Sequence, residues 1–86
     1  MFPTRQPGLV WRMVDDEVVI LNRQTEQVHR LNVTASHIWD LCDGANTPDE
    51  IAARLAGKFD RTAAQVIGDV HSTIAQLREL GLIASE

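Results

Sequence analysis

The spacing of apolar residues changes near residue 32. Before that point the apolar residues come in short runs rich in Val and Ile, which is typical of strands. After it they recur every three to four positions, as they do in helices that bury one face. The pattern therefore predicts a strand-rich first part followed by a helical second part, an α+β arrangement.

Three short strands are predicted in the first part. In residues 9–14, Leu9, Trp11 and Met13 alternate with Val10, Arg12 and Val14, so the two sets would lie on opposite faces of a strand. Residues 17–22 are nearly all apolar. Residues 28–31 form a third short run, which follows a polar turn. Asp15 and Asp16 suit a tight hairpin turn between the first two runs. Two successive hairpins predict a three-stranded antiparallel meander.

Three helices are predicted in the second part. Their N-caps are expected at Thr34, Thr47 and Thr62, because Thr side chains accept hydrogen bonds from the first helical N–H groups. The second and third caps are followed three residues later by Glu or Gln, which completes a capping box. Gly44 and Gly81 suit the left-handed position beyond the ends of the first and third helices.

The third helix carries a wider apolar stripe than one packing partner requires. At about 100° per residue, its main stripe consists of Val66, Val70, Thr73, Leu77 and Leu80. A second group lies to one side of that stripe and consists of Ile67, His71, Ile74 and Arg78. The additional apolar surface predicts a wall that is available to a partner.

Length, charge and cysteine content narrow the class of protein. The 86 residues, 44% of them hydrophobic, are expected to form one domain over residues 1–86. A net charge of −4 disfavours nucleic acid, since clustered Lys and Arg supply most affinity for phosphates. A single cysteine cannot form an internal disulfide, which fits the reducing cytoplasm. No apolar run approaches the ~18 residues that a membrane-spanning helix needs.

Candidate catalytic or metal chemistry concentrates in "HRLNVTASHIWDLCDG", residues 29 to 44. His37 and Cys42 lie about 140° apart around the predicted helix, and His29 lies in a strand, so these side chains are not expected to converge. Cys42 belongs to the apolar stripe and is interpreted as a small core residue. We therefore expect no metal, no cofactor and no enzymatic activity, and interpret the stretch as a strand-to-helix joint.

The segments "HRLNVTASHIWDLCDGANTPDEIAARL" and "VIGDVHSTIAQLRELGLI" resemble the PqqD-like family, named for pyrroloquinoline quinone biosynthesis protein D. The shared positions are Leu31, Asn32, Thr34, Ala35, Ile38, Trp39, Asp43, Gly44, Thr47, Glu50, Ile51, Leu55, Asp69, Val70, Leu77, Gly81, Leu82 and Ile83. The resemblance implies a winged-helix-like RiPP recognition element, which binds the leader of a ribosomally made precursor peptide and presents it to a modifying enzyme.

The resemblance also implies how the leader binds: it adds a strand to the third strand and lies against the third helix. The candidate peptide-binding residues are Val28, His29, Arg30 and Leu31 on the strand and Ile67, Asp69, Val70, His71, Ile74 and Leu77 on the helix. Val28, Ile67, Val70 and Ile74 are expected to line apolar pockets. The charges of Arg30 and Asp69 are expected to set the register.

The expected partners are a precursor peptide and a maturation enzyme, such as a radical SAM protein, a leader peptidase or a cyclase. Neither nucleic acid nor a membrane is expected, and the chain is expected to be a free-standing monomer or weak dimer. The pathway stays open between quinone biosynthesis, lasso peptides and other peptide maturation. Two alternatives are a winged-helix DNA-binding domain, disfavoured by the single Arg78 in residues 62–80, and a carrier domain, which lacks an Asp-Ser-Leu site.

Overall fold

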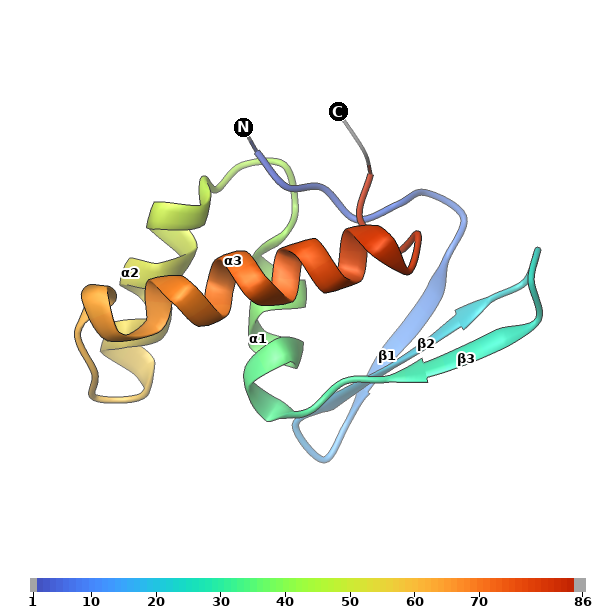
Figure 1. Ribbon diagram of the computed structural model, residues 1–86. Helices are drawn as coiled ribbons and strands as arrows, with labels where there is room; N and C mark the ends of the chain where they lie inside the picture. The colour runs from blue at the N-terminus through green and yellow to red at the C-terminus, as the bar shows by residue number, and fades with distance from the viewer. Residues whose placement is uncertain (1, 85–86) are drawn as a thin grey trace.

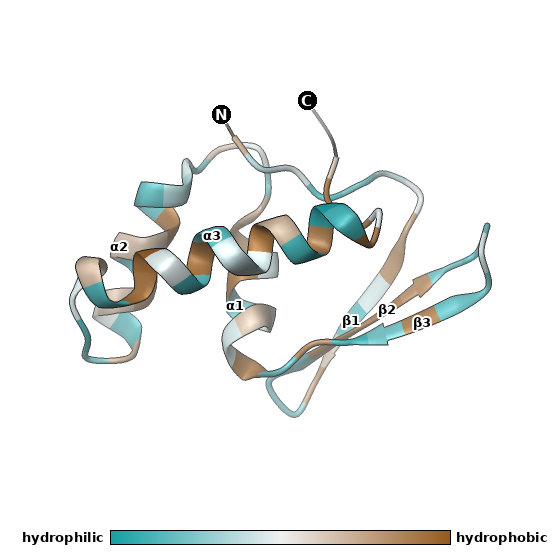
Figure 2. Ribbon diagram, viewed as in Figure 1, coloured by the Kyte–Doolittle hydropathy of each residue, from teal (hydrophilic) through white to brown (hydrophobic). Residues whose placement is uncertain are grey.

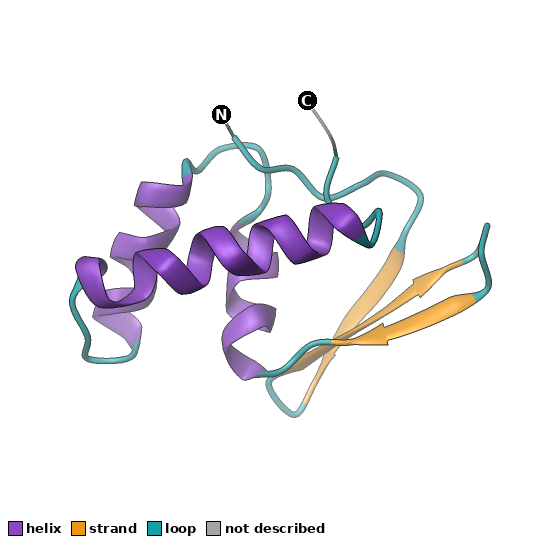
Figure 3. Cartoon of the chain, viewed as in Figure 1, coloured by secondary structure: helices purple, strands orange, loops and turns teal. Residues whose placement is uncertain are grey.

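The computed structural model describes residues 2–84. Within them, three strands precede three helices: β1 (Val10–Val14), β2 (Glu17–Asn22), β3 (Gln27–Arg30), α1 (Val33–Leu41), α2 (Pro48–Lys58) and α3 (Ala63–Glu79). The strands form an antiparallel sheet in the order β1-β2-β3, and the three helices pack together beside it (Figures 1 and 3). The predicted α+β order of a meander followed by three helices is confirmed.

The hairpin between β1 and β2 turns at Asp15 and Asp16, as predicted. Both residues have positive φ, 51° and 65°, which is the backbone conformation of a two-residue turn matched to the twist of the flanking strands. The turn brings Val14 opposite Glu17 and sets the pairing of the two strands.

The capping boxes of α2 and α3 are confirmed, but the N-cap of α1 is not where the sequence predicts it. Thr47 and Thr62 each accept a hydrogen bond from the backbone N–H three residues on. In α1, Asn32 caps instead of Thr34: its Oδ1 accepts from the N–H of Ala35 at 2.8 Å. The corner after β3 is one residue shorter than expected, so Val33 is already helical.

A single cluster of buried apolar side chains joins the sheet to the helices. Its members are Val18, Ile20, Leu31, Ile38, Trp39, Cys42, Ile51, Ala52, Leu55, Ala56, Val66, Val70, Ile74, Leu77, Leu82 and Ile83. Trp39 is fully buried and meets Trp11 of β1 edge to face, with ring centroids 6.0 Å apart. Brown, apolar residues accordingly recur along the helices in Figure 2. Phe59, at the end of α2, lies outside this cluster and is 37% exposed.

The first residues of the chain close one end of the structure. The guanidinium of Arg5 donates to the carbonyls of Trp39 and Asp40 at 3.0 and 2.9 Å, and it also lies 5.1 Å from the ring centre of Trp11. A cation at these carbonyls satisfies acceptors that the last turn of a helix leaves unpaired. Residues 4 and 5 bridge Asp43 and Ile83, which holds the segment in place.

The end of α3 returns the chain to the core. Gly81 has a φ of 76°. The N–H of Leu82 donates to the carbonyl of Leu77 at 2.9 Å, and the N–H of Gly81 donates to the carbonyl of Arg78 at 3.0 Å. This is the hydrogen-bond pattern of a Schellman motif, and it turns Leu82 into the buried cluster. Gly44 also has positive φ, but it lies two residues beyond Cys42, the C-cap of α1.

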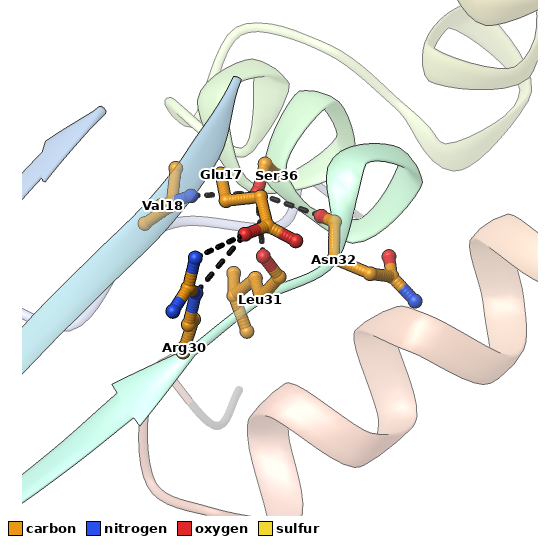
Figure 4. A network of polar contacts seen from close by, with 6 residues as sticks. All are labelled: Glu17, Val18, Arg30, Leu31, Asn32 and Ser36. Carbon is orange, nitrogen blue, oxygen red and sulfur yellow. Dashed lines mark hydrogen bonds and ion pairs between the residues drawn. The ribbon is translucent and has the colours of Figure 1, made fainter. Parts of the chain in front are cut away.

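The sheet and α1 are connected by the hydroxyl of Ser36, which is fully buried. Its Oγ accepts from the N–H of Val18 at 2.7 Å and lies 2.7 Å from the carbonyl oxygen of Asn32 and 3.2 Å from that of Leu31 (Figure 4). One side chain therefore satisfies polar groups from the start of β2 and from the corner between β3 and α1.

We expect Ser36→Ala to lower the free energy of unfolding by about 2 kcal/mol, because it leaves the buried N–H of Val18 without an acceptor. The control is Ser72→Ala on the exposed side of α3, which should change stability by less than about 0.5 kcal/mol. Urea unfolding followed by tryptophan fluorescence measures both. Equal stability of the two variants would show that the junction does not depend on this hydroxyl.

Candidate functional site: the open edge of the third strand

β3 forms one edge of the sheet. It pairs with β2 on one side, and among residues 2–84 no strand pairs with its other side. An edge strand presents unpaired N–H and C=O groups, which can bind an additional strand. Figure 1 shows β3 at this open side, leading directly into α1.

The hydrogen bond from the N–H of Leu31 to the carbonyl of Val18, at 2.9 Å, fixes which groups face the open edge. Leu31 and Val18 continue the register that pairs His29 with Ile20. In an antiparallel ladder, residues whose backbone groups point at the neighbouring strand alternate with residues whose groups point away. Those of Leu31 and His29 therefore point at β2, and those of Val28 and Arg30 point at the open edge.

The same alternation assigns the side chains to the two faces of the sheet. His29 is paired with Ile20, which is fully buried, so its side chain lies on the face that the helices cover. Val28 and Arg30 lie on the opposite face, and Val28 is 65% exposed. Leu31 is 9% exposed and belongs to the core. Of the four predicted strand residues, Val28 and Arg30 thus combine an open backbone with an exposed side chain.

Arg30 forms an ion pair with Glu17 of β2. Its Nε and Nη2 donate to the same carboxylate oxygen, at 3.0 and 2.7 Å (Figure 4). The Arg30 side chain is 69% exposed, so the pair is screened by solvent and contributes little to stability. Its main effect is to hold a positive charge beside the open edge.

His29 is half-buried on the helix-facing side of β3. Its Nε2 is shielded from solvent and has no hydrogen-bond partner within the described residues. An unpaired ring nitrogen next to the edge is a polar group that an incoming ligand can satisfy.

Two adjoining hollows, each of about 330 Å³, continue from the end of β3 along α3. Both are lined by Thr34 of α1 and Asp69 of α3. The hollow beside Asn32 is mostly polar, and its other lining residues are Ala35, Ser72, Thr73 and Gln76. The second has an apolar floor with a charged rim, and its other lining residues are Leu55, Phe59, Arg61 and Val66. We call the two together the α1–α3 groove.

Three of the α3 residues expected to bind the peptide lie in the core, as Leu31 does. Val70, Ile74 and Leu77 are 0, 2 and 2% exposed. Val66, Val70 and Leu77 of the main stripe and Ile74 of its flank pack against the other elements, so these side chains do not form a free wall. The Ile74 side chain is a stability determinant, and Ile74→Asp would bury a charge in the core rather than probe a groove.

Ile67 and His71 lie away from the α1–α3 groove. Ile67 is half-buried and lines a separate hollow of about 290 Å³ with Asp49, Ala52, Ala63 and Ala64, on the side of α2. His71 is exposed and lies about 200° around α3 from Asp69. Of the predicted helix residues, Asp69 lines the groove.

Apart from Asp69, the polar residues of α3 that line the groove were not predicted to bind the peptide. Asp69, Ser72, Thr73 and Gln76 follow one another at intervals of three, one and three residues, which places them on one side of α3. This spacing was the available signal, but the predicted wall was based mainly on the apolar residues of α3. The wall next to the end of β3 is therefore polar where an apolar one was expected.

Metal-ligating and thiol side chains are dispersed or buried in the described part of the chain. In residues 2–84, no three His, Cys, Asp or Glu side chains gather as a metal site would require. Burial raises the pKa of the Cys42 thiol to about 12, so it carries no nucleophilic thiolate at neutral pH. No helix within the same residues has the length and apolar character needed to cross a membrane.

The raised pKa of Cys42 predicts a specific loss of stability at high pH. Below the ordinary thiol pKa of 9.0 the thiol is protonated in both states, and above it the unfolded thiol ionises first and favours unfolding. From that pH up to about 12, stability should fall faster in the wild type than in Cys42→Ala, by up to about 1.4 kcal/mol per pH unit. Urea unfolding at successive pH values measures the difference, and parallel curves would contradict the assignment.

Comparisons with known proteins agree with the fold. A sequence model of the family described as coenzyme PQQ synthesis protein D (PqqD) matches residues 17–83, from β2 to the buried residues after α3. A search of curated proteins finds no match.

Solved structures extend the likeness to the whole fold. TbiB1, in complex with the TbiA(beta) leader peptide, is 25% identical, has a TM-score of 0.85 and is matched over 96% of each chain. A lasso peptide synthetase B1 complexed with its leader peptide is 19% identical, with a TM-score of 0.85, over 99% of this chain and 100% of that one.

A third structure is the PqqD truncation of Methylobacterium extorquens PqqCD, described as a functional, stand-alone RiPP recognition element. It is 24% identical, with a TM-score of 0.78, over 96% of this chain and 88% of that one. Sequence family and fold therefore agree.

Proposed function

The chain belongs to the PqqD family, and from this premise we propose that it binds the leader segment of a ribosomally synthesised precursor peptide by adding the leader as a fourth strand to β3. Two of the solved structures described above contain a bound leader peptide, which supports a peptide ligand here.

The observation that carries the proposal is the direction of the backbone groups on β3. Val28 and Arg30 point their N–H and C=O groups away from β2, at an edge that no described strand covers. A peptide in extended conformation can pair with these groups without displacing any bond of the sheet. Such pairing depends on the backbone, so it provides affinity for a strand irrespective of its sequence.

The α1–α3 groove would give specificity. It begins at Asn32, two residues after the end of β3, so a peptide paired with β3 and extended past Arg30 would enter it. Near the strand the groove offers hydroxyl and amide groups and the Asp69 carboxylate, and farther along it offers the apolar floor of Leu55 and Val66. We propose that polar leader side chains bind in the first hollow and an apolar one in the second.

We propose that residues 1–86 act as one non-catalytic recognition domain that holds the leader for a separate maturation enzyme. The single core cluster supports one domain, and the protonated, buried thiol of Cys42 supports a binding rather than a catalytic role. A single, unpaired cysteine fits the cytoplasm, where precursor peptides are made.

Proline substitutions test strand addition directly. Proline removes the backbone N–H, so it is tolerated only where that N–H is not paired in the sheet. We expect Arg30→Pro to remain folded and to lose leader binding by tenfold or more, whereas His29→Pro should unfold because the His29 N–H belongs to the ladder with β2. Fluorescence anisotropy with candidate leaders and thermal melts measure the two properties.

Two controls separate the edge from its side chains. Arg30→Ala removes the guanidinium but keeps the N–H, so it should bind more tightly than Arg30→Pro. Met13→Pro places proline on the other open edge, since the same alternation points the Met13 N–H away from β2; it should bind as the wild type does. If Arg30→Pro bound normally and Met13→Pro did not, the leader would pair with β1.

Hydrogen exchange gives an independent readout of the same proposal. In the free domain, the amides of Val28 and Arg30 should exchange rapidly and that of His29 slowly, because only the latter is bonded within the sheet. A bound leader should protect Val28 and Arg30. Protection confined to α3 would indicate binding in the groove without strand addition.

A further inference from the structure

The face of the sheet opposite the helices carries a row of exposed apolar side chains that runs toward the open edge. Val10, Leu21 and Val28 are paired in register across the three strands. They are 46, 36 and 65% exposed, and the edge residue Val28 is the most exposed of the three. Since side chains at paired positions lie side by side on one face, the row ends at β3 with an uncovered flank.

The adjacent row on the same face carries charge at its edge. It consists of Arg12, Val19 and Arg30, again paired across the strands. The Arg30 guanidinium uses Nε and Nη2 to bind Glu17, so within residues 2–84 the N–H groups of Nη1 remain available to a ligand. A guanidinium can donate to two carboxylates at once. Arg30 can therefore keep Glu17 and accept a second acidic group.

We propose that the bound peptide carries an acidic residue opposite Arg30 and, two positions later, an apolar β-branched or aromatic residue opposite Val28. The inference rests on the proposed strand addition, because only a strand paired with β3 continues both rows. Residues opposite Val28 and Arg30 share their face, so the acidic residue meets the Arg30 guanidinium and the apolar residue covers the exposed flank of Val28. The residue between them points to the helix side, toward His29.

The order of the two residues follows from the direction of the added strand. Every strand pair in this sheet is antiparallel, and antiparallel pairing is slightly more stable per residue than parallel pairing. β3 runs from Val28 to Arg30, so the peptide passes Arg30 first and Val28 second. The ligand class is thus a peptide with the order acidic, any residue, apolar, whose preceding residues lie in the α1–α3 groove.

Selection from a library of short random peptides displayed on phage tests the inference without knowledge of the natural leader. Peptides selected by the wild type should be enriched in Asp or Glu two positions before Val, Ile, Phe, Tyr or Trp. Selection by Arg30→Glu should replace the acidic residue by Lys or Arg at the same position. The wild-type peptides should bind this variant about fivefold more weakly or worse.

Arg12→Glu is the matched control, because Arg12 occupies the same row on β1, two strands from the open edge. It changes the net charge of the domain equally and should leave the acidic preference unchanged. If the acidic preference changed to a basic one with both variants, or with neither, the pairing with Arg30 would be overturned. The reverse order, apolar before acidic, would overturn the antiparallel direction.

The proline variant separates this inference from the proposed function. Selected peptides that bind Arg30→Pro as tightly as the wild type would overturn strand addition and the inference with it. Peptides that require the Arg30 N–H but show no acidic preference would leave strand addition intact and overturn only the charge assignment.

Discussion

The hydrogen bond between the N–H of Leu31 and the carbonyl of Val18 is the constraint on which the site depends. It fixes which residues of β3 have backbone groups bonded to β2, and this register decides two properties of the open edge. The backbone groups of Val28 and Arg30 face the open edge, and their side chains face away from the helices. A shift of one residue would exchange both properties and expose His29 and Leu31 instead.

The buried hydroxyl of Ser36 holds this register in place. It satisfies the N–H of Val18 and lies within hydrogen-bonding distance of the carbonyls of Leu31 and Asn32, so the start of β2, the corner after β3 and the first turn of α1 share one side chain. An alternative register would leave these buried groups unpaired, at a cost comparable to a large part of the stability of a small domain. The joint between strand and helix is therefore also the element that keeps the edge correctly oriented.

The proposed ligand site combines two kinds of recognition with separate physical origins. The edge of β3 offers backbone groups, which recognise an extended chain whatever its sequence. The α1–α3 groove and the two rows on the outer face, which end at Val28 and Arg30, offer side chains, which recognise particular residues. A small domain can in this way bind a peptide selectively, because the sheet supplies affinity and the flanking side chains supply discrimination.

The sequence by itself determined the elements and their order. The Asp15-Asp16 turn, the capping boxes at Thr47 and Thr62 and the reversal at Gly81 are local features, whose geometry is decided by residues a few positions apart. The predicted third strand was correct to within one residue at each end, and residue patterns sufficed to indicate the family. Local chemistry also misled at one point: Asn32 and Thr34 are both good caps, and only the short corner after β3 selects Asn32.

The tertiary structure decided which side of each element is free. From sequence, α3 has an apolar stripe and a flank, but only packing against the sheet and the other helices shows that Ile74 belongs to the core and that Ile67 faces α2. Likewise, whether the backbone groups of Val28 or those of His29 face the open edge depends on a hydrogen bond between residues 31 and 18, which no local pattern specifies. Burial and register are properties of pairs of elements, so they are fixed when those elements pack together and not by the sequence of either one.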